Sequence, residues 1–357
     1  MIYRATGSIA VLTAGVLFLA GCQTQPERHP AGPAGVAPRV HYPTMGKIER
    51  FDPELERILP VYAVIEQLAD GFKWSEGPVW VAEWDSLLFS DVPENKVYRW
   101  HEVAGLSVLL HPSGYTGPVG RGGESGSNGL TLDAKGRLVL CQHGDRRVAR
   151  LEPDGRFKTL AAYYKFMRFN SPNDLVYHPN GDLYFTDPTY GLEQGVDDPR
   201  RELMFSGVFR LRPDGEVTLL TDQLTFPNGV AFAPGGRQLY VSVSDPQNPV
   251  IMRYDLNSDG TLGPGQVFFD AKPLADEGRK GLPDGLKTDL QGNVFATGPG
   301  GVLVLSPAGQ LLGIINTGEA IANCAWGDDG SVLYLTSHGY LCRVKTWTRG
   351  FGALVLP

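Results

Sequence analysis

One short phrase recurs six times along the 357-residue chain and constrains its fold more than any other feature. In each copy a polar residue, usually followed by glycine, begins an alternating apolar run, and a turn and a second alternating run follow. The polar residues that begin the six copies are Glu76, Asn128, Asn173, Asn228, Asp284 and Asn323. Such alternation is typical of strands, and turn signals such as Lys135-Gly136 and Asn180-Gly181 predict that the paired runs form β-hairpins.

Further strand-like runs follow each hairpin, so that each repeat of roughly 40 to 55 residues holds about four short strands, as in a β-propeller. The sequence therefore predicts an all-β fold, a six-bladed β-propeller. The segment AVIEQLADGF at 63–72 precedes the first copy and has no partner in its own repeat, so we expect it to close the ring by adding a strand to the last blade. The chain has 45 Gly, 27 Pro and 42% hydrophobic residues, which excludes a disordered chain and disfavours a helical bundle.

The N-terminus has the pattern of a targeting segment. Arg4 precedes an apolar run at 8–20 that is too short to span a bilayer permanently, and Leu19-Ala20-Gly21-Cys22 resembles the lipobox of bacterial lipoproteins. We expect a lipoprotein signal peptide at 1–21, a lipid on Cys22, a Pro-rich tether at 22–45 and the propeller at 46–357. Gln23 favours the outer membrane, with the protein facing the periplasm. An ordinary signal peptide or a retained anchor is the alternative.

The innermost strand of each propeller blade runs along the central axis, so equivalent positions of the six blades face one another. Two carboxylates and four amides, with no lysine or arginine at these six positions, would then converge at one mouth of the channel. Carboxylates at close range repel unless a cation lies between them. Amide and carboxylate oxygens suit calcium, and magnesium, manganese or zinc less well. The alternative is that Asn-Gly and Asp-Gly only form turns before the strands, and Asn323, which precedes Cys324, is the weakest member of the ring.

Long ordered motifs carry a resemblance to a known family. FKWSEGPVW, SNGLTLDAKGRLVLCQHGDRRVARL, FNSPNDLVYHPNGDLYFTDPTYGL, FPNGVAFAP and LPDGLKTDLQGNVFAT closely resemble the gluconolactonase branch of the SMP-30/gluconolactonase/LRE-like family, over about 70 to 350. The resemblance implies a single divalent cation, bound by Glu76, Asn173, Asn228 and Asp284, and implies that Asp284 is the general base. The animal branch has an arginine two residues before the position of Asn173, where this chain has Ser171.

The resemblance predicts hydrolysis of a sugar-acid lactone to the aldonic acid. This reaction requires a polarised carbonyl, an activated water and stabilisation of the oxyanion. The cation would meet the first and third needs, and Asp284 the second by taking a proton from water. A hydroxide bound to the metal is the competing mechanism.

Three further residues are candidate substrate contacts: Asn128, His143 and Asp187. The last two stand at the ends of predicted second strands, where a polar loop residue or a turn former is the alternative role for each. The Gly-rich segment 111–127 precedes Asn128 and is either a mobile lid carrying Tyr115 and Arg121 or a plain flexible insertion.

Other functions of the site remain open. A lactonase, esterase or phosphotriesterase of different specificity could use the same residues, and a propeller that only binds a carbohydrate or a protein needs no catalysis. The net charge of -7 gives no footprint for nucleic acid. No GxSxG, HExxH or P-loop motif is present, and the cysteines lack CxxC spacing, so no zinc site is implied. Cys324 and Cys342 are either bridged or free thiols beside Cys141.

Overall fold

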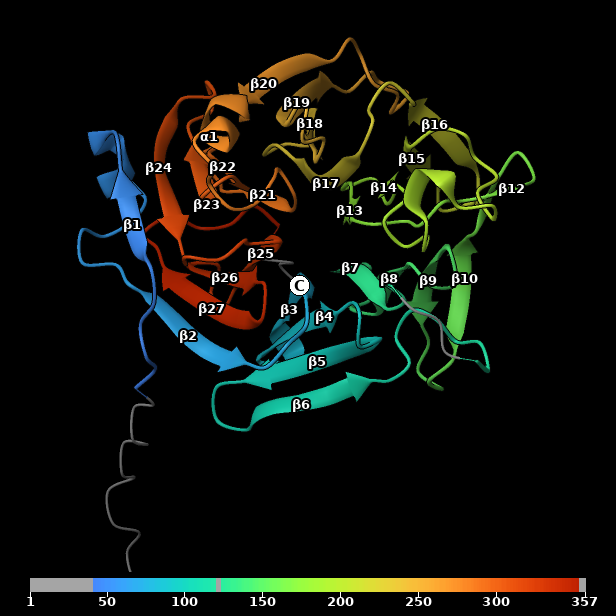
Figure 1. The fold of residues 1–357 in the computed structure, drawn as a ribbon, viewed down its shortest axis with the longest axis horizontal. Coiled ribbons are helices and arrows are strands. Elements are labelled where there is room, and N and C mark those ends of the chain that lie inside the picture. The colour runs from blue at the N-terminus through green and yellow to red at the C-terminus, as the bar shows by residue number, and fades with distance from the viewer. Residues whose placement is uncertain (1–40, 120–122, 353–357) are drawn as a thin grey trace, which may run out of the picture. The chain divides into compact units, whose positions relative to one another are not determined.

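The computed structural model describes residues 41–119 and 123–352, and its compact unit begins at Tyr42. This unit contains six antiparallel sheets that follow one another around a ring, with the strand of the repeated phrase nearest the centre in each sheet (Figure 1). The predicted all-β, six-bladed propeller is confirmed. The predicted signal peptide, the lipidated Cys22 and residues 23 to 40 of the tether lie outside the described residues.

The blades follow one another in chain order, and each of the first three is a four-stranded meander. Blade 1 contains β3 (Ser75–Val81), β4 (Ser86–Asp91), β5 (Lys96–His101) and β6 (Gly105–Leu110). Blade 2 contains β7 (Ser127–Leu132), β8 (Leu138–Gln142), β9 (Arg147–Leu151) and β10 (Phe157–Ala161). Blade 3 contains β13 (Leu175–Tyr177), β14 (Leu183–Asp187), β15 (Gly207–Leu211) and β16 (Val217–Thr221).

The second half of the ring repeats the same order, with a change at the last blade. Blade 4 contains β17 (Pro227–Phe232), β18 (Gln238–Val243), β19 (Val250–Asp255) and β20 (Gln266–Asp270). Blade 5 contains β21 (Leu286–Thr288), β22 (Val294–Gly298), β23 (Gly301–Leu305) and β24 (Leu311–Asn316). Blade 6 takes only β25 (Asn323–Gly327), β26 (Val332–Ser337) and β27 (Tyr340–Lys345) from this end of the chain.

Two N-terminal strands join the end of the ring. β2 (Ile65–Asp70) pairs antiparallel with β27 and supplies the outer strand of blade 6, with Ile65 opposite Val344. The predicted closing strand within 63–72 is therefore confirmed. β1 (Lys47–Arg50) pairs with β24 and gives blade 5 a fifth strand, which the sequence pattern did not reveal.

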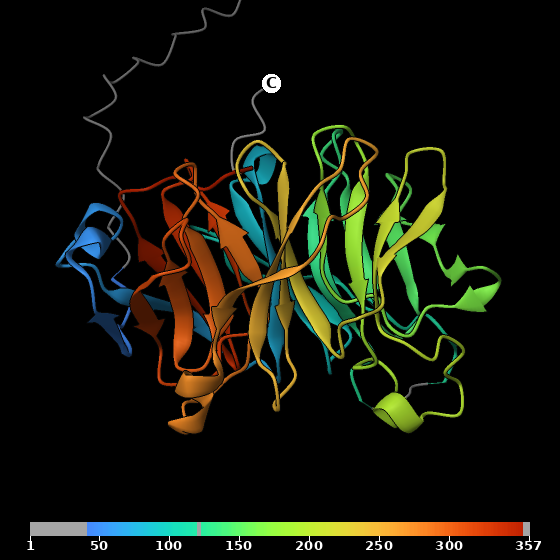
Figure 2. The ribbon, with the colours of Figure 1, turned by 90° about the horizontal axis from the view of Figure 1, so that it is seen from above.

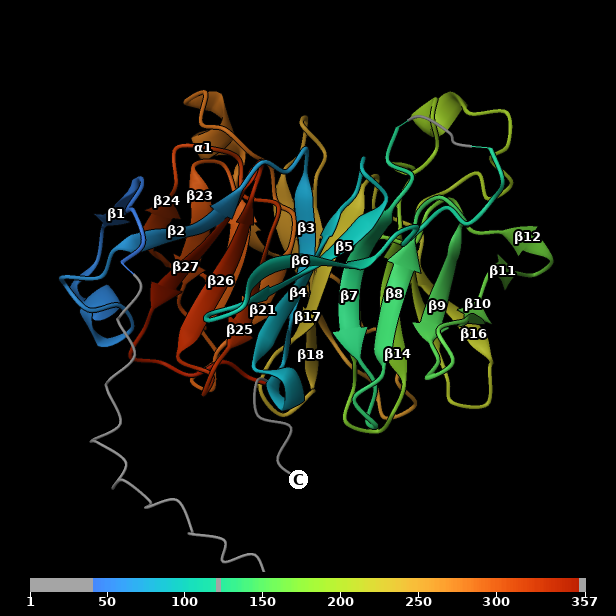
Figure 3. The same ribbon diagram turned by 90° about the horizontal axis from the view of Figure 1, so that it is seen from below.

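The remaining elements are short and lie in the connections. They are η1 (Pro53–Arg57), η2 (Ala82–Trp84), the ribbon of β11 (Tyr163–Tyr164) and β12 (Met167–Arg168), η3 (Gly195–Asp197) and α1 (Lys272–Asp276). Views at right angles to the axis show that the loops carrying η3 and α1 project from the same face of the ring (Figures 2 and 3). No helix of the described part is long and apolar enough to cross a bilayer.

The predicted hairpins form because a turn residue with positive φ reverses the chain between two alternating runs. Gly136, with φ of 72°, lies in the turn between β7 and β8, where Leu132 pairs with Leu138. A left-handed conformation costs glycine little, since it has no Cβ. Each hairpin buries one face against the neighbouring blade.

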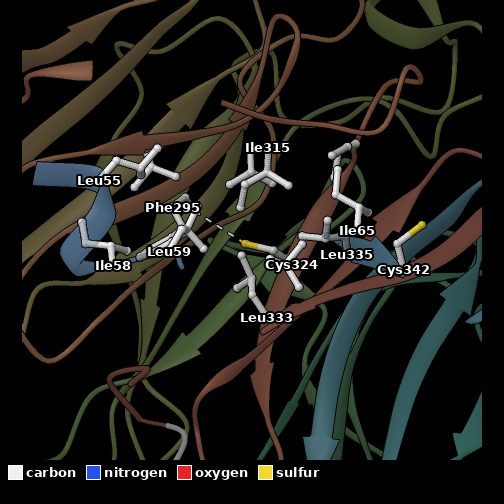
Figure 4. Close-up of a cluster of buried hydrophobic side chains, with 14 of the residues drawn as sticks. Leu55, Ile58, Leu59, Ile65, Phe295, Ile315, Cys324, Leu333, Leu335 and Cys342 are labelled. Carbon is white, nitrogen blue, oxygen red and sulfur yellow. Dashed lines mark hydrogen bonds between the residues drawn. The ribbon is translucent and has the colours of Figure 1, made fainter. Parts of the chain in front are cut away.

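Six hydrophobic clusters hold the ring together, and each lies between two consecutive blades. The largest joins blades 5 and 6 and includes residues of η1 (Figure 4). In it, the rings of Phe295 and Trp326 pack edge to face with their centroids 4.8 Å apart. Cys324 and Cys342 belong to this cluster, and both are buried free thiols, as is Cys141. The predicted alternative of three free thiols is therefore the one found.

Candidate metal and catalytic site

The six polar residues of the repeated phrase stand at equivalent points of the inner strands. Three of them are second residues of a strand: Glu76 in β3, Asn128 in β7 and Asn228 in β17. Asn173 and Asp284 lie two residues before β13 and β21, and Asn323 is the first residue of β25. All inner strands run in the same direction along the axis, so these residues gather at one end of the channel.

The glycine that follows most of these residues allows neighbouring inner strands to approach closely. A Cβ on Gly77 would stand 2.0 Å from the carbonyl oxygen of Asn128, and one on Gly229 would stand 2.1 Å from that of Asp284. Gly129 N donates to Asn173 O at 2.7 Å across the same kind of junction. Each glycine therefore places one ring residue beside the next, which a hairpin turn alone would not require.

Glu76 and Asp284 face each other from blades 1 and 5. Glu76 is 1% exposed, and its Oε2 accepts from Asn323 Nδ2 at 3.1 Å and from Gly77 N. Burial raises the pKa of Glu76 to about 7, and the charge of Asp174 adds to the shift. Burial and the charge of Glu76 raise the pKa of Asp284 well above its usual range. Two buried carboxyls in mutual contact are the arrangement that a bound cation relieves.

Most side-chain amide oxygens of the ring lack a hydrogen-bond donor among the described residues. Asn228 Nδ2 donates to Ser244 Oγ at 3.0 Å, and Ser244 donates in turn to Pro283 O, which fixes the orientation of the amide. Four buried side-chain oxygens then accept no hydrogen bond from any described residue: Asn128 Oδ1, Asn173 Oδ1, Asn228 Oδ1 and Asp284 Oδ1. Unpaired buried acceptors are costly, so convergent ones indicate a missing positive partner.

This donor set fits a hard divalent cation. Nowhere in the described ranges do three or more His, Cys, Asp or Glu side chains gather as a metal cluster, so the donors are chiefly amide oxygens together with two carboxylates. Oxygen donors of this kind suit calcium better than zinc. Asn323 is differently engaged, because its Oδ1 accepts from Cys324 N at 2.9 Å and lies 3.4 Å from Lys287 Nζ.

The three predicted substrate contacts occupy different surroundings. Asn128 lies in the ring itself and is 4% exposed. His143 follows β8 and is fully buried, with its Nδ1 3.2 Å from Glu124 Oε2, although the pair does not have hydrogen-bond geometry. The charge of Glu124 also contributes to the raised pKa of Asp284.

Asp187 is a fully buried carboxyl that supports the loop before Asn173. Its Oδ2 accepts from Asn170 N at 2.8 Å and its Oδ1 from Ser171 N at 2.8 Å. Burial raises the pKa of Asp187 to about 7. With both oxygens engaged by backbone amides, the geometry favours the turn-forming role over substrate contact, and it positions the segment that presents Asn173.

Ser171 does not replace the arginine found at its position in the animal branch. The hydroxyl donates to Pro188 O at 2.6 Å and accepts from Gly191 N at 2.9 Å, so it is used within its own loop.

The Gly-rich segment 111–127 is anchored where it is described. Asn95 Oδ1 accepts from Ser113 N at 3.0 Å and from Gly114 N at 2.7 Å. Tyr115 packs against Gly144 beside the end of β8. Arg121, the other residue predicted on this segment, lies outside the described residues.

Sequence reasoning missed four residues at this end of the channel. They are Asp174, Tyr190, Ser244 and Lys287. The phenol of Tyr190 lies beside Asn228 and Ser244, and burial together with the charge of Asp284 raises its pKa. Asp174 occupies the place that glycine has in most copies of the phrase, and that departure was the one available signal.

Comparison with known proteins identifies the family of this chain. The profile of the SMP-30/Gluconolactonase/LRE-like region matches residues 74–339. The chain is 41% identical over 313 residues to a gluconolactonase of Zymomonas mobilis, which covers 86% of this chain and 88% of that protein. The solved structure of a gluconolactonase from Xanthomonas campestris is 31% identical with a TM-score of 0.75, covering 87% of this chain and 99% of the other.

A more distant solved structure shares the fold alone. It is a regucalcin from Agrobacterium tumefaciens, described as a calcium-binding protein, with 20% identity, a TM-score of 0.63 and coverage of 80% of this chain and 94% of the other. The extent of the profile match and the identity to the Zymomonas protein together settle the family. This chain is a member of the SMP-30/gluconolactonase/LRE-like family.

Proposed function

We propose that this protein hydrolyses a sugar-acid lactone with the help of one divalent cation. We propose that the cation is calcium and that Glu76, Asn173, Asn228 and Asp284 bind it. The protein is a lactonase, as its identity to a curated gluconolactonase over most of both chains supports. The observation that supports the metal site is the set of buried ring oxygens that accept no hydrogen bond from the part of the chain that the structure describes. In addition, burial and the charge of Asp174 disfavour the ionised form of Glu76 unless a cation is bound nearby.

The residues of the ring supply the remaining chemistry. When bound, the cation polarises the lactone carbonyl and stabilises the oxyanion. Asp284 takes a proton from the attacking water and acts as the general base. Asn128 presents an unpaired amide oxygen toward the channel and orients a sugar hydroxyl. His143 and Glu124 flank the substrate on the side of blade 2.

The test uses metal-free full-length protein and a panel of aldonolactones, with calcium, magnesium, manganese or zinc added back. We expect activity to return with calcium. Asp284→Asn should lower kcat by about 100-fold or more while the circular dichroism spectrum stays unchanged. Asp222→Asn, at an exposed site in the loop after β16, is the matched control. Full turnover in excess chelator, or in the Asp284→Asn protein, would refute the mechanism.

The location of the protein is a second proposal, supported by the N-terminal sequence alone. We propose that a lipid on Cys22 tethers the propeller in the bacterial cell envelope, at the outer membrane facing the periplasm. In a Gram-negative host the wild-type protein should fractionate with membranes, and Cys22→Ser should not. Equal membrane association of the two proteins would contradict the proposal.

A further inference from the structure

Lys287 of β21 lies beside the ring and is connected to it through the side-chain amide of Asn323. Lys287 Nζ donates to Leu286 O at 3.0 Å and lies 3.4 Å from Asn323 Oδ1. The other end of that amide, Asn323 Nδ2, donates to Glu76 Oε2 at 3.1 Å. The charge of Lys287 lowers the pKa of Glu76, so the ammonium acts on the ring electrostatically as well.

A third buried carboxyl also acts on the ring. Asp174 is 3% exposed, and its Oδ1 accepts from Leu175 N at 2.9 Å. Its Oδ2 accepts from Val230 N of β17 at 3.4 Å. Its charge raises the pKa of Glu76 and of Asp284, which belong to blades 1 and 5, so the carboxylate acts on both ring carboxyls. Within the described ranges, none of these three carboxyls forms an ion pair with a lysine, arginine or histidine.

The charges of this cluster balance only when both a cation and the lysine are counted. Three carboxylates carry three negative charges, and a divalent ion supplies two of the required positive charges. We propose that Lys287 supplies the third and thereby determines which cation the ring prefers, favouring a divalent over a trivalent ion and moderating the affinity for both. The inference depends on the metal site proposed above.

The expected size of the effect follows from distance and charge. The path through the Asn323 amide places the ammonium roughly 8 Å from an ion bound at Glu76. Removal of one positive charge there strengthens divalent binding by about 1,000-fold at an effective dielectric of about 20, and by a little under tenfold at the dielectric of water, so a gain of at least about tenfold is expected at this buried site. Repulsion scales with the charge of the ion. A trivalent ion should therefore gain more from removal of the lysine than a divalent ion does.

The test is direct titration of metal-free full-length protein with calcium and, separately, with terbium, followed by calorimetry. Lys287→Met removes the charge at similar length, and Lys287→Gln removes it while keeping a hydrogen-bond donor for Asn323. Both should bind calcium at least about tenfold more tightly than wild type and terbium with a still larger gain. Lys287→Arg should stay near wild type. Lys345→Met, at an exposed end of β27, is the control for loss of one positive charge and should change neither affinity.

The possible results separate two failures. If wild type binds calcium and both neutral variants, folded by circular dichroism, bind it equally or more weakly, Lys287 has no such role. The same holds if Lys345→Met gives an equal gain, or if calcium and terbium gain by the same factor. If wild type binds neither ion, the proposed metal site itself fails.

Discussion

Replacing Glu76 by glutamine should stabilise the metal-free protein and remove its response to calcium. Glu76 is fully buried beside Asp284 and Asp174, and its carboxylate is disfavoured there without a cation. A glutamine keeps an acceptor for Asn323 Nδ2 and Gly77 N. Its amide also offers a donor toward Asp284 in place of a like charge.

The magnitude follows from the pKa of Glu76. A rise from the ordinary 4.5 to about 7 means that the native state holds the proton more tightly than the unfolded state. At pH 7 the ionised group then costs on the order of 3 kcal/mol of unfolding free energy. Glutamine carries no such cost, so Glu76→Gln should gain about that amount. The gain should be full above pH 7, shrink as the pH falls, and vanish below about 4.5, where Glu76 is protonated in both states.

The assay is urea denaturation from pH 4.5 to pH 8, in chelator and again in excess calcium. In chelator, Glu76→Gln should be more stable than wild type at pH 7 and 8 and equal to it near pH 4.5. In calcium, wild type should gain stability and Glu76→Gln should not. Glu83→Gln, at an exposed site in η2, should match wild type throughout. A metal-free Glu76→Gln protein that is less stable than wild type at pH 8 would refute the reasoning, as would an unchanged calcium response.

Two further substitutions test the support of the ring. Asp187→Ala should lower the free energy of unfolding by about 2 to 5 kcal/mol, because the amides of Asn170 and Ser171 lose their buried acceptor; urea denaturation measures this, and a loss under about 1 kcal/mol would contradict it. Gly229→Ala should abolish lactonase activity and calcium binding, since its Cβ would stand 2.1 Å from Asp284 O, whereas Gly263→Ala in an outer hairpin should retain both.

The sequence predicted the fold well because the strand pattern is repeated six times, so that a weak pattern in one copy is supported by the other copies. The closing strand β2 was recognisable because an alternating run without a local partner must pair elsewhere. β1 was not recognisable, because four residues are too few to show a clear alternation of apolar and polar side chains. Its pairing with β24 also requires that blade 5 has already formed.

The site was less predictable than the fold. The repeated phrase marked Glu76 and Asp284, whose roles as ligand and base stay predictions, but Lys287 lies within its phrase at a position where no charge was expected. Its relation to Glu76 passes through Asn323, more than thirty residues further along the chain. Ser244 and Tyr190 likewise belong to loops, and only the three-dimensional arrangement brings them beside Asn228.

The pairing of β2 with β27 has a consequence for biogenesis. The outer strand of blade 6, β2, precedes all five other blades' inner strands in the chain, and its partner β27 follows them. The ring therefore stays open during translation until all six blades have been made, and the nascent chain has to avoid aggregation while β2 remains unpaired. Deletion of either β2 or β27 should prevent the ring from closing.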